Sequence, residues 1–170
     1  MILDLRVFEE FPASTTIAAG PGELSPFDGS VIRVDGVEAD LAIQKSANEF
    51  FCQGQVAARM VLECARCLVK FETELTGPTD FIVCSAEDVA RYSDGDNENY
   101  VRFLGNELRA DIVEPVRQAL VLALSMKPLC SEDCRGLCAS CGANLNERTC
   151  DCKKETIDPR WDGLKNLNPE

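Results

Sequence analysis

The sequence predicts an α+β protein: an antiparallel, barrel-like β-sheet with one main helix, plus a small C-terminal cysteine-rich zinc module. Three observations predict this class. Apolar residues alternate with polar ones over much of residues 37–84, a single helical apolar pattern follows at about 111–126, and six of the ten cysteines lie within 130–152. Alternation is typical of half-buried strands, and a period near 3.6 is typical of a helix packed on a sheet.

The alternating segments follow one another along the first half of the chain. Half-buried strands are predicted at residues 3–7, 37–44, 56–64 and 69–75, with a short apolar run at 81–84. Together they describe an antiparallel meander with one covered face. FPASTTIAAGPGEL (11–24) is rich in proline, glycine and serine, so it predicts a turn or an irregular edge. The acidic stretch 85–100 predicts an exposed, mobile loop, and YVRFL (100–104) a brief return to extended chain.

The main helix is predicted at about 111–126. Asp111 and Glu114 have the spacing of a capping box, and Pro115 falls in the first turn, where its missing N–H matters little. Apolar residues then recur at helical spacing until Lys127-Pro128 ends the helix. A helix this apolar is expected to lie against the sheet.

A module boundary is predicted after the helix, where the chain becomes rich in cysteine and poor in apolar residues. We expect a β-rich domain with its packed helix over 1–127 and a cysteine-rich zinc-binding tail over 128–170. The tail closes with DPRWDGLKNL (158–167), whose first two residues predict the cap and first turn of a short helix.

Composition and charge bear on compartment and partners. The start of the chain lacks the basic region of a secretory signal, and no apolar run approaches the roughly 20 residues of a spanning helix, so we expect a cytoplasmic protein with no membrane partner. The formal net charge of −12 argues against a basic nucleic-acid-binding face, although acidity by itself also keeps proteins soluble. If charge selects a partner, we expect a basic protein, bound through the acid-rich residues 72–114.

The tail cysteines predict a metal site, because disulfides are rare in a reducing compartment and clustered thiols there more often hold a metal. Cys138 and Cys141 are the best-defined pair. Two residues between them let one tight turn direct both sulfurs at one ion, and Gly142 permits the positive φ of such a knuckle. A segment with so few apolar side chains cannot order itself by burial, whereas a structural zinc ion contributes the folding free energy.

Tetrahedral zinc takes four thiolates, but the tail offers six. The candidate ligands are Cys130, Cys134, Cys138, Cys141, Cys150 and Cys152. Cys138 and Cys141 are expected in the site. The other two ligands come either from Cys130 and Cys134, on one helical turn capped by Ser131, or from the last pair, and the sequence leaves this choice open. An all-cysteine site has no open position, so the expected zinc is structural.

An iron–sulfur cluster is a rival interpretation of the same residues. The spacing Cys134-x3-Cys138-x2-Cys141 also occurs in radical enzymes that hold such a cluster. Those enzymes carry it at the front of a large βα barrel, and this chain is too short and too rich in meander strands for that fold. We therefore do not expect a cluster.

Cys64 and Cys67 lie between two strand patterns and are expected at the tip of a hairpin. Three interpretations remain open: half of a second or shared zinc site completed by tail cysteines, a redox pair, or a turn with incidental thiols. A redox pair normally sits at a helix N-terminus, which lowers a thiol pKa, so redox chemistry is not expected here. Cys52 and Cys84 lie in strand patterns and are expected in the core.

The sequence offers few of the residue combinations that enzymes commonly use for catalysis. The chain contains no histidine, so it has no Ser–His or Cys–His pairing and no common acid–base group near neutrality. It also has no glycine-rich phosphate loop. We expect a protein that is not an enzyme.

Three stretches together resemble the large-ribosomal-RNA-subunit accumulation protein family (YceD-like). They are VLECARCLVKFE, the tail stretch SMKPLCSEDCRGLCASCGANLNERTCDC and the closing DPRWDGLKNL, and the likeness covers roughly residues 55–167. It implies a small bacterial or organellar protein needed for normal accumulation of the large-subunit ribosomal RNA. By position, Cys64 and Cys67 match the family's mid-chain pair. The six tail cysteines match a tail found in many members of the family. Other members lack that cluster entirely, which makes the mid-chain pair the better functional candidate.

The leading hypothesis is a non-enzymatic ribosome-biogenesis factor that supports accumulation or processing of large-subunit ribosomal RNA. It would act through a ribosome assembly factor, a basic large-subunit ribosomal protein or ribosomal RNA itself. One alternative is a metal-dependent ribonuclease acting on ribosomal RNA precursors, but its two ions need acids on a rigid scaffold, and the predicted loop at 85–100, which holds five acids, is not such a scaffold. The other alternative is a redox or zinc-handling protein.

Overall fold

The computed structural model describes residues 1–24, 27, 31–92, 99–105 and 107–152. The strands are β1 Ile2–Asp4, β2 Ala13–Ala19, β3 Val31–Ser46, β4 Glu49–Glu63, β5 Lys70–Cys84, β6 Tyr100–Arg102 and β7 Arg109–Asp111. The helices are the 3-10 turn Leu5–Val7, α1 Ala86–Tyr92 and α2 Val113–Ala123. The mostly-sheet α+β class is thereby confirmed, and the helix predicted at 158–167 lies outside the described residues.

The main sheet has the strand order β2–β3–β4–β5–β6. Its first four strands form the predicted antiparallel meander, whereas β6 runs parallel to β5, so the sheet is mixed. The barrel-like prediction is wrong: within the described part of the chain the sheet stays open. The physical reason is the length of its last strand, because three residues of β6 cannot pair along the seven residues of β2.

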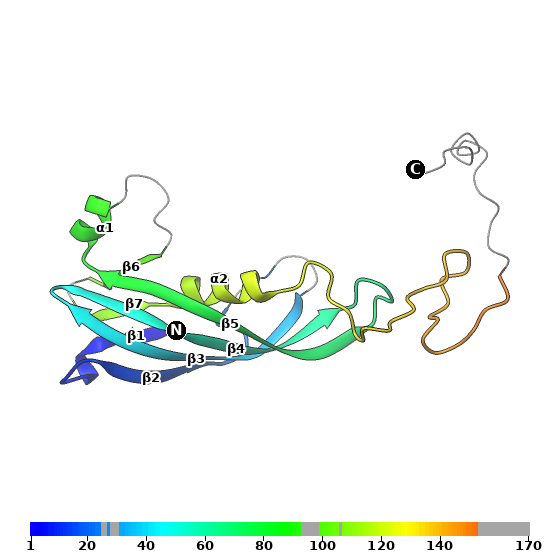
Figure 1. The fold of residues 1–170 in the computed structure, drawn as a ribbon, viewed down its shortest axis with the longest axis horizontal. Coiled ribbons are helices and arrows are strands. Elements are labelled where there is room, and N and C mark those ends of the chain that lie inside the picture. The colour runs from blue at the N-terminus through cyan, green and yellow to red at the C-terminus, as the bar shows by residue number, and fades with distance from the viewer. Residues whose placement is uncertain (25–26, 28–30, 93–98, 106, 153–170) are drawn as a thin grey trace, which may run out of the picture.

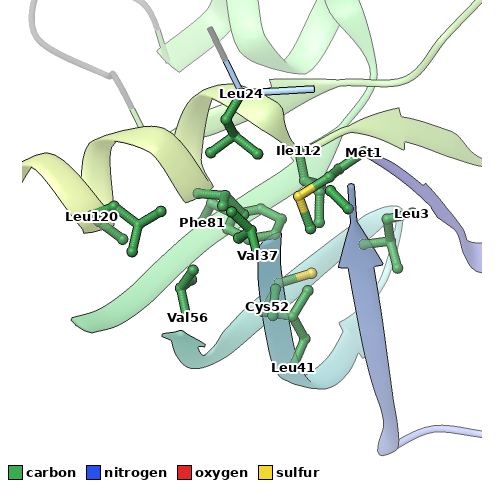
Figure 2. Packing of buried hydrophobic residues seen from close by; sticks show 14 of the residues in the cluster. Met1, Leu3, Leu24, Val37, Leu41, Cys52, Val56, Phe81, Ile112 and Leu120 are labelled. Carbon is green, nitrogen blue, oxygen red and sulfur yellow. The ribbon is translucent and has the colours of Figure 1, made fainter. Parts of the chain in front are cut away.

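One face of this sheet carries the core. Helix α2 and the small sheet of β1 and β7 lie against it (Figure 1). Figure 2 shows Leu3 of β1, Leu120 of α2 and Ile112, which lies between β7 and α2, in one buried cluster with Val37 and Phe81 of the sheet. Burial alternates along β3, β4 and β5, as the sequence pattern predicts for a sheet with one covered face.

Three strand predictions need correction. β2 forms where a turn or irregular edge was predicted, because half-buried residues alternate with exposed ones along Ala13–Ala19 despite the flanking prolines and glycines. The runs 69–75 and 81–84 belong to one continuous strand, β5, which tolerates Pro78 because β6 pairs only with Ile82–Cys84 and leaves that stretch at the sheet edge. In 3–7 only the first residues are strand, and the chain then turns.

The acidic stretch 85–100 also differs from its prediction as a loop. It begins with helix α1, whose first-turn acids Glu87 and Asp88 favour a helix N-terminus. Ser85 starts this helix: its hydroxyl oxygen accepts the Asp88 N–H at 3.2 Å, and the hydroxyl donates to the Asp88 carboxylate at 2.7 Å. Residues 93–98 lie outside the described part.

A helix is confirmed in the predicted region, but α2 spans Val113–Ala123 instead of about 111–126, and it starts without the predicted capping box. Asp111 accepts the N–H of Val113 at 3.1 Å, two residues on. Glu114 turns instead to Arg117, at 2.5 Å. The helix packs closely on β5 at Gly77, where a Cβ atom would lie 3.0 Å from the Ala119 carbonyl oxygen. No helix in the described ranges has the length and apolar character needed to span a membrane.

Candidate metal centres

Eight of the ten cysteines gather into two groups of four. The inner cysteine group consists of Cys64, Cys67, Cys130 and Cys134. The outer cysteine group consists of Cys138, Cys141, Cys150 and Cys152. Within each group all four sulfurs lie within 4.8 Å of one another, so each group could hold a metal ion.

The turn between β4 and β5 positions the first half of the inner group. The N–H of Cys64 donates to Val69 O at 3.0 Å, and the N–H of Leu68 donates back to Cys64 O at 2.9 Å. Leu68 has a φ of 59°, which closes this turn in a left-handed conformation. Cys64 and Cys67 therefore sit at the tip of a hairpin, as predicted, and both are buried.

The tail reaches the hairpin tip after α2 and docks on it through backbone contacts. The N–H of Ala65 donates to Pro128 O at 2.8 Å, and the Arg66 guanidinium donates to Cys134 O at 2.9 Å. Gly136 lies against the same turn: its φ is 72°, and a Cβ there would lie 3.0 Å from Arg66 O. Hydrogen bonds between the hairpin turn and the tail thus hold the two halves of the inner group together, in addition to any contact between the sulfurs.

The sulfur geometry of the inner group fits a tetrahedral ion. The Sγ atoms of Cys64 and Cys134 are 3.8 Å apart, and those of Cys67 and Cys130 are 3.6 Å apart. A zinc–sulfur bond of about 2.3 Å gives a tetrahedron edge of about 3.8 Å, whereas a disulfide needs about 2.05 Å. All ten cysteines are free thiols. The sulfur separations are therefore of the length found in a metal-ligand shell and are too long for a disulfide.

The pKa values in the inner group diverge. Burial opposes ionisation of Cys64, but surrounding N–H groups, including that of Arg66, lower its pKa to about 6. Burial likewise opposes ionisation of Cys134, but its pKa is lowered because the Asn146 side-chain amide donates to its sulfur at 3.3 Å. The neighbouring Cys67 thiol raises the pKa of Cys130 to about 12. A set of thiols in which some ionise readily suits a soft divalent cation, which displaces the remaining protons.

The outer group is built on a knuckle turn. The N–H of Cys138 donates to Ala143 O at 2.8 Å, and the N–H of Gly142 donates to Cys138 O at 2.9 Å, with Gly142 at a φ of 69° as the sequence predicts. The N–H groups of Cys141 and Ser140 lower the pKa of Cys138 to about 6. The knuckle is more accessible than the inner group, because Cys141 and Cys152 are both exposed.

Asn146 joins the two groups. Its side-chain oxygen accepts the Arg135 N–H at 2.7 Å, while its side-chain nitrogen donates to the Cys134 sulfur at 3.3 Å. The N–H of Leu145 also donates to Gly136 O at 2.9 Å. Sequence reasoning missed both Asn146 and Arg66. The sequence does offer a signal for them. Arg66 lies between Cys64 and Cys67, Asn146 lies between Cys141 and Cys150, and both are polar residues that can donate a hydrogen bond to a sulfur or a carbonyl.

Each of the eight cysteines that the sequence indicates as candidate ligands belongs to one of the two groups. Cys150 and Cys152 join the knuckle pair, while Cys130 and Cys134 join the hairpin pair. Of the interpretations left open for the hairpin pair, this arrangement matches a site completed by the tail. The predicted helical turn capped by Ser131 is instead a simple turn, closed by the Cys134 N–H on Ser131 O at 3.1 Å.

The remaining two cysteines lie apart from both groups, as predicted. Cys52 and Cys84 are fully buried in β4 and β5. Burial raises the pKa of Cys52 to about 12 and also raises that of Cys84. Both are therefore core residues that stay protonated at neutral pH.

Known proteins match most of the chain. The family model "Large ribosomal RNA subunit accumulation protein YceD" matches residues 52–168. The chain belongs to the YceD family. The match begins within β4 and includes both cysteine groups, and it confirms the family resemblance found from the sequence.

Individual relatives of this YceD family member cover different shares of it. YCED homolog 1 from Arabidopsis thaliana chloroplasts, named as a large ribosomal RNA subunit accumulation protein, is 35% identical over 75 residues, 44% of this chain and 23% of that protein. An uncharacterized Mycobacterium tuberculosis protein is 31% identical over 137 residues, 79% of this chain and 63% of that protein. The chain thus spans less than two thirds of the length of these relatives. No solved structure matches significantly.

Proposed function

We propose that this YceD family member supports the accumulation or processing of large-subunit ribosomal RNA as a non-enzymatic ribosome-biogenesis factor in the cytoplasm. The observation that carries the proposal is the family match over residues 52–168. That segment holds the β4–β5 hairpin, α2 and both cysteine groups. The chain acts through contacts with a ribosome assembly factor or a basic large-subunit ribosomal protein, which its net charge of −12 favours over bare RNA.

Each cysteine group, in this proposal, holds one structural zinc ion. Four sulfurs close each shell and leave no open position, and the 3.6 and 3.8 Å sulfur separations of the inner group fit zinc–thiolate geometry. The inner ion ties the tail to the hairpin through Cys64 and Cys67. The outer ion orders the knuckle, which has little apolar surface of its own.

Metal content tests the zinc assignment. The full chain, purified under reducing conditions, is expected to carry about two zinc ions, and Cys64→Ser or Cys141→Ser about one each. The control Cys84→Ala removes a buried thiol outside both groups and should keep both ions. A chain that binds no zinc, or that binds iron instead, would overturn the assignment.

Depletion in cells tests the ribosomal role. Loss of the protein is expected to lower mature large-subunit ribosomal RNA relative to small-subunit RNA, measured by gel analysis of total RNA and by sucrose-gradient profiles of ribosomal subunits. Re-expression of the wild-type chain should restore the ratio. Unchanged profiles after depletion would contradict the role, and magnesium-dependent cleavage of precursor RNA by the purified protein would contradict a non-enzymatic one.

A further inference from the structure

The main sheet has a second face that no described element covers. Along each long strand the side chains of this face alternate with those that point into the core, so exposed residues alternate with buried ones. The open face is defined here by its acidic residues Glu38, Asp40, Glu72, Glu74 and Asp80, and the same face also carries the cations Arg33, Arg59 and Lys70. Five of these eight charged side chains are acidic.

Some acids of the protein pair with an arginine at short distance. On the covered side, Asp4 pairs with Arg6 at 2.6 Å, and Glu107 and Glu114 each have an arginine partner at 2.5 Å. Among the described residues, by contrast, the five open-face carboxylates form no ion pair. Arg59 lies opposite Glu74 in the strand register, and Arg33 interacts electrostatically with Glu72, so these cations offset the negative charge of the face only in part.

The open face is also hollowed. One hollow of about 300 Å³ is lined by the small residues Ala18, Gly36 and Ala57, by the carboxylates of Glu38 and Glu74, and by Arg59. A second, of about 530 Å³, is lined by polar residues including Asp40 and Gln55. Lysine and arginine lay their aliphatic stems on such floors while their charged ends reach a carboxylate.

We propose that the open face is the docking surface for a basic polypeptide segment of the partner in large-subunit assembly. Charge complementarity supports a protein as the occupant, because the same carboxylates repel the phosphates of RNA. The inference rests on the proposed function and adds the surface to it. It also refines the expected site at 72–114: Glu72, Glu74 and Asp80 belong to the open face, whereas Glu107 and Glu114 lie on the covered side with partners of their own.

Charge reversal tests the face on the purified full chain. The double variant Glu38→Lys/Glu74→Lys changes the face, and the control Glu9→Lys/Glu10→Lys makes the same change in net charge at exposed positions before β2. The probes are a short fluorescent peptide of alternating lysine and alanine and a fragment of large-subunit ribosomal RNA. The double variant should weaken peptide binding about tenfold or more, and the control less than about twofold. Equal effects, or tighter wild-type binding to the RNA than to the peptide, would overturn the proposal.

Photocrosslinking in cells identifies the occupant. A photoreactive residue at Gln55, on the open face, is compared with one at Leu122, which is 86% exposed on α2. A basic large-subunit or assembly protein should crosslink from Gln55 alone, and the open-face double variant should abolish that product. Crosslinks to RNA, to a second copy of the chain, or from both positions alike would refute the proposal. Ribosomal RNA accumulation is scored separately in a depleted strain, so failure of the ribosomal role is distinguishable from failure of the surface.

Discussion

Alanine at Gly136 tests the docking of the tail on the hairpin most directly. The residue has a φ of 72°, and a Cβ there would lie 3.0 Å from Arg66 O and 3.4 Å from Arg66 Cβ. The left-handed conformation costs alanine about 1 kcal/mol, and crowding against the turn costs about 1 kcal/mol more, the lower end for overpacking. The sum of about 2 kcal/mol corresponds to an about 30-fold larger population in which the tail has left the turn.

Gly142→Ala provides the matched control. Gly142 has nearly the same φ, 69°, but nothing lies within 4 Å of a Cβ placed there. Gly142→Ala is therefore expected to lose only about 1 kcal/mol of stability, from the left-handed backbone conformation, and this loss falls in the outer knuckle. The two variants separate crowding at the docking contact from general strain in the tail.

Hydrogen exchange measures the effect at the contact itself. The Ala65 N–H donates to Pro128 O at 2.8 Å, so its exchange reports each opening of the tail from the turn. Exchange of the peptide covering 64–69 should accelerate about 30-fold in Gly136→Ala and stay close to wild type in Gly142→Ala. Equal exchange at Ala65 in wild type and Gly136→Ala would refute the reasoning.

Two further predictions concern the body of the protein. Gly54→Ala should destabilise the fold by about 3 kcal/mol or more, because its Cβ would lie 1.8 Å from the Asp40 carbonyl oxygen. Urea unfolding followed by circular dichroism measures this, Gly20→Ala is the unstrained control, and an unchanged midpoint for Gly54→Ala would contradict it. Separately, the hydrogen bond from Arg6 lowers the pKa of Asp4 from 3.8 to about 2, so the associated stabilisation is present above pH 3.8 and is lost as pH falls through about 2. An NMR titration should find this low pKa, with Arg6→Gln returning it toward 3.8, and an unaltered Asp4 titration in that variant would show that Arg6 is not the cause.

The sequence predicts the parts of the fold that depend on apolar patterning. Alternation along β3 and β4 and the helical repeat of α2 reflect burial on one side, and burial is visible in residue type. It does not predict β2, since the small side chains of Ala13–Ala19 carry a weak pattern between turn-forming residues. Nor does it predict the open edge of the sheet, which depends on how few residues β6 contributes.

The grouping of the cysteines was only partly predictable from the sequence. Spacing identifies Cys138 and Cys141 as a knuckle because both the turn and its glycine are local. The partners of Cys64 and Cys67 lie 70 and 63 residues further on, and only the path of the chain after α2 brings them together. Local spacing carries no information about a contact between segments so distant.

That separation has a consequence for biosynthesis. A ribosome translating this chain makes Cys64 and Cys67 long before their partners, Cys130 and Cys134, which lie beyond the last helix of the β-rich body. A nascent or prematurely terminated chain that stops at α2 therefore has only two of the four thiols of the inner group, both at the hairpin tip. Closure of the four-sulfur shell therefore requires a polypeptide translated at least through Cys134.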